Sequence, residues 1–76
     1  METPVEFLQR LRRDPERKLK GDDGSRSTRE VAEACGMKLA TVRRQLWKAV
    51  EDDLVEAFDG GGSGTSGNQI FWQAKQ

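Results

Sequence analysis

Residues 27–50 read STREVAEACGMKLATVRRQLWKAV, and this stretch decides the fold because it holds two helical patterns separated by one glycine. The first pattern begins with a capping box, in which the Ser27 hydroxyl accepts from the backbone amide of Glu30 and the Glu30 carboxylate accepts from that of Ser27. We expect a helix over 28–35 that stops at Gly36, since glycine is the residue best suited to a left-handed helix end. The apolar face of this helix is expected to carry Val31, Ala34 and Cys35.

The second helical pattern covers residues 39–52. At about 100° per residue, its apolar residues fall into a single stripe, as expected for a helix packed on a core. The stripe consists of Leu39, Val42, Leu46, Ala49 and Val50. Two helices joined by a glycine turn predict a helix-turn-helix, whose second helix commonly enters the major groove of duplex DNA.

Two short apolar segments, 54–58 and 69–74, flank a glycine-rich loop over 59–68, and this arrangement predicts a β-hairpin. In the second strand Ile70 and Trp72 alternate with Phe71 and Gln73, so one aromatic faces the core. The wing tip, residues 60–67, has five glycines and no charge. We expect it to be mobile and to touch only phosphate. A helix-turn-helix followed by a hairpin is a winged helix, a small α+β fold with three helices and a hairpin wing over about 54–74.

The N-terminal segment contains a second capping box, TPVE at residues 3–6, with proline at the first helical position. It predicts a helix over 4–13 that ends before Pro15, because proline disfavours helical geometry in the residue preceding it. One further turn reaching Lys20 would have Leu19 as its only apolar anchor. A short strand near Arg26 is expected to add an edge to the hairpin. The core face of the first helix is expected to carry Phe7, Leu8 and Leu11.

Composition limits the classes of protein to which the chain can belong. Its 76 residues form one domain, 1–76, which buries roughly 60% of the surface of the unfolded chain. With no His and one Cys, it has too few ligands for a zinc site and no partner for an intramolecular disulfide, so we expect a cytoplasmic, reducing setting. No apolar run is long enough for a signal peptide or a membrane span. No cofactor or small-molecule ligand is indicated.

The sequence also argues against an enzyme. It has no His, no phosphate-binding glycine loop between a strand and a helix, and no paired carboxylates in a predictable cleft. Cys35 has no His to activate it and lies on an apolar stripe, which favours a buried structural role.

The net charge is zero, but the charges are separated along the chain. Residues 38–48 hold four basic side chains and no acid, whereas residues 51–59 hold five acids and no base. The positive pole therefore lies on the helix expected over 39–52.

The outward side of that helix supplies the candidate DNA contacts. Residues near the N-terminal end of such a helix enter the groove first, so three side chains are candidates for base edges: Thr41, Arg44 and Gln45. Arginine pairs with guanine and glutamine with adenine. Three other basic residues are placed for phosphate contacts: Lys38, Arg43 and Lys48. Ala40 lies on the same outward arc.

Residues 28–55 resemble the winged-helix transcriptional regulators of the MarR and ArsR type. The resemblance is carried by Gly36, Thr41-Val-Arg-Arg44, Leu46 and Asp53-Leu-Val55. It implies double-stranded DNA as the partner and transcriptional regulation as the function. Asp53 stands where these families usually have glycine, Lys38 stands where a Ser or Thr helix cap is usual, and the wing lacks the arginine that often reaches the minor groove.

Two alternatives stay open. A winged helix can serve as a protein-interaction module, with Trp47, Phe71 and Trp72 forming an apolar patch and the acidic stretch 51–59 meeting a basic partner. An aromatic on the outer flank of the 39–52 helix together with a Trp in the wing also resembles the Z-conformation-binding winged helices, whose helix-borne Asn position is Arg43 here. The sequence leaves open a monomer, a weak homodimer through the first helix, or a protein partner.

Overall fold

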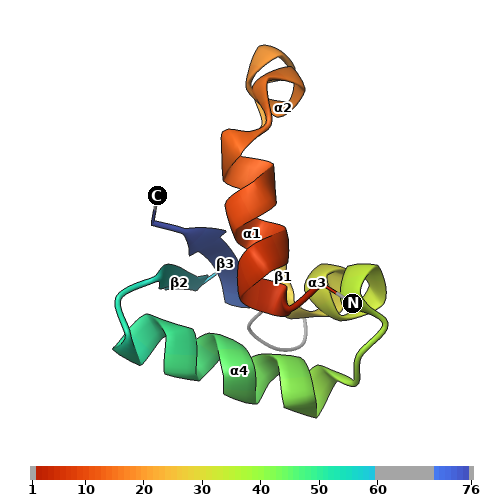
Figure 1. Ribbon diagram of the computed structural model, residues 1–76, viewed down its shortest axis with the longest axis vertical. Helices are drawn as coiled ribbons and strands as arrows, with labels where there is room; N and C mark the ends of the chain where they lie inside the picture. Colours follow the sequence, from red (N-terminus) through yellow and green to blue (C-terminus); the bar gives the residue numbers. More distant parts are fainter. Residues whose placement is uncertain (1, 60–69, 76) are drawn as a thin grey trace.

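The computed structural model describes residues 2–59 and 70–75, which form four helices and one three-stranded antiparallel sheet (Figure 1). The fold class is therefore α+β. The order along the chain is α1 (Pro4–Arg13), α2 (Pro15–Leu19), β1 (Arg26–Ser27), α3 (Thr28–Cys35), α4 (Leu39–Glu51), β2 (Val55–Asp59) and β3 (Ile70–Ala74).

The ends of α1, α3 and α4 follow from local sequence signals. Both expected capping boxes form, one closing on Thr3 and the other on Ser27, and the predicted helices 4–13 and 28–35 are confirmed. Gly36 ends α3 in the left-handed region, with φ of 64°. Helix α4 ends one residue earlier than expected, at Glu51, and Asp53, which follows the C-cap Asp52, adopts φ of 65°. A position at which glycine is usual in the resembled families is therefore left-handed here too.

Strand β3 is the central strand of the sheet, in the order β1-β3-β2. Trp72 pairs with Arg26 on one side and with Ala57 on the other, so the expected short strand near Arg26 is confirmed. Leu54 lies outside β2, because its amide donates to the Ala49 carbonyl (2.9 Å) and so belongs to the turn that closes α4. The predicted wing tip, residues 60–67, lies outside the described residues.

The core joins α1, α3 and α4 to one face of the sheet. The expected core residues of α1 are confirmed for Phe7 and Leu8, while Leu11 is partly buried. The prediction for Leu39 is wrong: this side chain is 47% exposed, because it begins α4 and has no preceding helical turn over it. In α3, Ala32 is buried and Ala34 is exposed, since α3 packs against both α1 and α4 on the Ala32 side.

Trp72 is the largest fully buried side chain, and a hydrogen bond orients it. Its indole Nε1 donates to the Thr28 hydroxyl at the start of α3 (2.8 Å). Its ring makes a T-shaped contact with that of Trp47 in α4, with ring centroids 4.9 Å apart and planes at 80°. This contact links the hairpin to α4.

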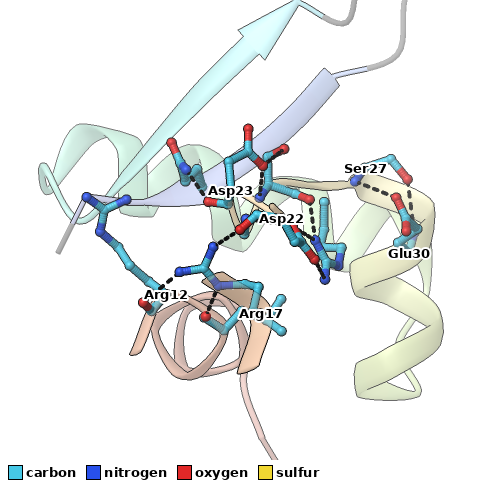
Figure 2. A network of polar contacts seen from close by, with 11 residues as sticks. Arg12, Arg17, Asp22, Asp23, Ser27 and Glu30 are labelled. Atoms are coloured by element: carbon cyan, nitrogen blue, oxygen red, sulfur yellow. Dashed lines mark hydrogen bonds and ion pairs between the residues drawn. The ribbon is translucent and has the colours of Figure 1, made fainter. Parts of the chain in front are cut away.

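Helix α2 is anchored by a buried arginine, and the expectation that Leu19 anchors it is wrong. Leu19 is 88% exposed, whereas Arg17 is buried. The Arg17 guanidinium donates to the carbonyls of Leu11, Arg12 and Asp22, the Arg12 contact being 2.8 Å (Figure 2). Three backbone acceptors converge on this site, and a guanidinium can satisfy all of them at once.

Asp22 continues this network toward the sheet. Its carboxylate accepts from the guanidinium of Arg26 in β1 (2.7 Å) and from the Gly24 amide (2.8 Å). The neighbouring Asp23 carbonyl accepts from the side-chain amide of Gln73 in β3. The segment between α2 and β1 is therefore tied to the sheet at two points (Figure 2).

Within the described ranges, no helix is both long and apolar enough to cross a membrane.

Candidate nucleic-acid interface

The buried stripe of α4 determines which of its side chains face outward. Val42, Leu46 and Ala49 are buried in the core, and Val50 is packed against it. In Figure 1, α4 lies across one end of the molecule, at the opposite end of the longest axis from α2. The side of α4 that faces away from the core is therefore accessible along its length.

Six of the seven candidate contacts are exposed on this side: Lys38, Ala40, Arg43, Arg44, Gln45 and Lys48. Thr41 is half-buried, so its hydroxyl is less accessible than expected for a base contact. No ion pair joins the four basic side chains of this set to a carboxylate of another described residue. We call these seven residues the basic face of α4.

Most charges at the two ends of α4 are unfavourable to the helix dipole, and Lys48 in the last turn is the exception. The N-terminal end of a helix favours acids and the C-terminal end favours bases. Here the first turn has no acid and the N-cap is Lys38, while Glu51 and Asp52 lie at the C-terminal end. Each unfavourable placement costs about 0.3 to 1 kcal/mol. Helix stability therefore accounts for Lys48 in the last turn but not for Lys38, Glu51 and Asp52.

Lys38 also caps α4 poorly. Its side chain makes no capping hydrogen bond, as expected when lysine occupies a position suited to Ser or Thr. The first turn of α4 thus keeps a positive side chain next to backbone amides that lack side-chain partners, a combination that favours an incoming phosphate.

Trp47 borders the basic face, one turn after Arg43. It is 43% exposed, and its contact with the buried Trp72 ring restricts its orientation. Because Trp72 is itself held by Thr28, the exposed part of the Trp47 ring is presented by a rigid support. The sequence placed Trp47 on the outer flank of the helix but could not show this support.

The expected aromatic patch of Trp47, Phe71 and Trp72 does not form as such. Trp72 is fully buried, because its ring fills the space between the sheet and the helices. Phe71 is half-buried and is paired in register with Phe58 of β2 on the neighbouring strand, while Trp47 packs on Trp72 from α4. An apolar surface could include Trp47 or Phe71 but not Trp72.

A reactive cysteine and a metal site are two further kinds of functional site. Cys35 is buried, and this burial raises the pKa of its thiol, as for a structural cysteine. No group of three or more side chains suited to metal binding occurs in the part of the chain that the structure describes.

Comparisons with protein-family models, with curated proteins and with solved structures found no match.

Proposed function

We propose that this chain is a winged-helix domain that binds double-stranded DNA through α4 and acts in transcriptional regulation in the cytoplasm. The observation that carries the proposal is the basic face of α4, whose four basic side chains are exposed and have no ion-pair partner among the described residues. The order of elements, with α3 and α4 joined at Gly36 and followed by a hairpin, supports the winged-helix assignment.

In this proposal the basic face divides its contacts by position. Arg44 and Gln45 reach base edges, because they project from the first half of α4. Three basic residues contact phosphates: Lys38, Arg43 and Lys48. Thr41 is half-buried and contributes at the margin of the contact, beside the small side chain of Ala40.

The test compares Arg44→Ala and Lys48→Ala with Arg10→Ala in a duplex-binding assay over a salt series. Arg10 is a matched control, since it is an exposed arginine on α1 that already pairs with Glu2 (2.8 Å). Loss of a base contact at Arg44 should weaken binding by about 1 to 3 kcal/mol, and loss of a phosphate contact at Lys48 by less, with a shallower salt dependence.

Both variants should keep the melting temperature of the wild type, because both side chains are exposed. Wild-type affinity in both would contradict DNA binding through α4. If binding to a protein partner then survived the Arg44 substitution, the protein-interaction alternative would be favoured.

The edge contact between Trp47 and Trp72 favours a second candidate, a duplex in the left-handed Z conformation. The contact places an aromatic on the flank of α4 directly against the hairpin tryptophan, the combination by which the chain resembles the Z-conformation-binding winged helices. Arg43, at the Asn position of those proteins, offers a charge-assisted donor to a phosphate or a base.

Circular dichroism of an alternating cytosine–guanine duplex distinguishes the two candidates. Under the second, adding the protein inverts the spectrum toward the left-handed form, Trp47→Ala abolishes the inversion and Trp47→Phe keeps part of it. An unchanged right-handed spectrum at saturating protein would contradict this candidate and leave the first intact.

A further inference from the structure

Helix α2 presents an apolar side chain to solvent on a rigid support. Leu19 is 88% exposed, more than any other large hydrophobic residue of the described chain. The buried Arg17 holds the helix through three backbone carbonyls, and Asp22 ties the following turn to β1. The exposure of Leu19 is thus imposed by the fold, and Figure 1 shows α2 projecting at one end of the longest axis.

The exposed charges next to this leucine are mostly basic. Residues 15–20 hold three basic side chains and one acid, and the buried Arg17 is occupied by backbone carbonyls, so the exposed charges are Lys18, Lys20 and Glu16. Lys18 and Lys20 flank Leu19 and are exposed. We call residues 15–20 the tip.

A surface of opposite character lies where α4 leads into β2. Leu54 is 44% exposed, and residues 51–56 hold four acids and no base. These acids are exposed: Glu51, Asp52, Asp53 and Glu56, of which Asp53 pairs with Lys75. We call residues 51–56 the corner. In Figure 1 the corner lies toward the end of the molecule opposite α2, so the tip and the corner of one copy do not meet.

We propose that the tip of one copy docks on the corner of a second copy of this chain. Each surface has an exposed leucine at its centre and a charged surround, and the two surrounds have opposite sign. Contact would remove both leucines from water and bring lysines beside carboxylates. DNA does not fit the corner, which repels phosphate, and the tip lies at the far end of the molecule from the basic face of α4.

The contact between tip and corner can repeat from one copy to the next. The tip and the corner are different surfaces, so the contact is heterologous, and a pair of copies keeps one free tip and one free corner to which further copies can add. Each surface is small, and small interfaces are weak. Association is therefore expected near millimolar protein at low salt, and at lower concentrations where several copies are held close together.

Sedimentation velocity and concentration-dependent amide shifts test the contact at low salt without DNA. The wild-type chain should sediment faster as its concentration rises, with shift changes at residues 18–20 and 51–54, and added salt should reverse both effects. Reversing the tip (Lys18→Glu with Lys20→Glu) or the corner (Glu51→Lys with Asp52→Lys) should each weaken association by about ten-fold or more.

A chain that carries both sets of reversals restores opposite signs and should associate again. Leu19→Ser should abolish association, whereas Leu39→Ser, at an exposed leucine outside both surfaces, should not. A wild-type chain that stays monomeric throughout, shift changes elsewhere, or a doubly reversed chain that stays monomeric would each overturn the proposal. Because no DNA is present, none of these results bears on DNA binding by α4.

Discussion

Arg17 shows how one buried charge can organise a segment that has little apolar surface. Between Asp14 and Ser25 the only large aliphatic side chain, Leu19, points to solvent. A guanidinium carries five N–H donors in a planar fork, and here it serves carbonyls from the end of α1 and from the turn at Asp22. Polar contacts thus hold α2 in place, whereas apolar packing holds the other helices.

Replacing Arg17 with methionine, which keeps an unbranched apolar stem but no guanidinium, should lower the free energy of unfolding by about 2 to 4 kcal/mol, because three carbonyls lose a charged donor. The free energy of unfolding of Arg17→Lys should lie between those of the wild type and Arg17→Met, since an ammonium keeps the charge but cannot reproduce the planar fork. Urea denaturation measures the change, with the exposed Arg13→Met as control. A wild-type midpoint for Arg17→Met would show that α2 is not held in this way.

Asp22 gives the same network a dependence on pH. The hydrogen bond from the Arg26 guanidinium, followed by that from the Gly24 amide, lowers the pKa of the Asp22 carboxyl from 3.8 to about 2. The native state therefore prefers the ionised form. The resulting stabilisation is complete above the unfolded-state pKa and is lost as the pH falls from about 4 to about 2.

We expect Asp22→Asn to be less stable than the wild type at neutral pH and to approach it in stability near pH 2. Urea denaturation at a series of pH values measures this, with Asp52→Asn, an exposed carboxyl outside the network, as control. A stability difference that stayed constant from neutral pH to about 2 would mean that the Asp22 charge does not contribute.

At the scale of elements, α3 and α4 differ in how they begin. Helix α3 has a complete capping box on Ser27, whereas α4 begins at Lys38 without a side-chain cap. The helix proposed to bind DNA is thus the less well capped of the two. The N-terminal turn of α4 lacks the stabilising side-chain cap and has the positive charge of Lys38 in its place.

Adding a cap to α4 and removing the cap of α3 should have opposite effects on stability. Lys38→Ser should stabilise the fold by about 0.5 to 1 kcal/mol, and Ser27→Ala should destabilise it by about 1 kcal/mol. If Lys38 contacts a phosphate, Lys38→Ser should also reduce the salt slope of DNA binding by about one. Thermal denaturation and a salt titration measure the two effects, and a destabilised Lys38→Ser would contradict the capping argument.

At the scale of the whole molecule, the core depends on a few side chains at the meeting point of the helices and the sheet. Leu46, Leu8 and Trp72 are fully buried there. A chain of this length has a small core, so each of these residues is a large part of it. Leu39, in the same helix, lies at the edge of this region.

Leu46→Ala should lower the free energy of unfolding by about 2 to 5 kcal/mol, because it leaves a cavity that the neighbours fill only in part. Leu39→Ala should cost less than about 1 kcal/mol, as for other exposed positions. Both substitutions remove the same atoms from α4. The difference between their free energies of unfolding, measured by chemical denaturation, therefore isolates the effect of burial. Equal losses in the two variants would show that α4 is rotated relative to this description.

Several features could be predicted from the sequence because they depend on residues within one helical turn or on one pair of strands. The capping boxes at Thr3 and Ser27 and the left-handed end at Gly36 are of this kind. So is the basic face of α4, since charged side chains with no buried partner must face water. The exposed positions of Arg43 and Arg44 follow from the buried stripe opposite them.

Other features were decided only by the tertiary structure, because burial depends on what lies against a residue and not on the residue alone. Sequence periodicity placed Leu39 on the buried stripe, and Leu19 was the only apolar anchor available to the turn after Pro15, but no element covers either side chain. Arg17 is buried because two carbonyls at the end of α1 and one at Asp22 converge on it, and sequence periodicity does not reveal that convergence. Trp72 is oriented by Thr28, 44 residues away along the chain, a contact that exists only once the sheet has packed on α3.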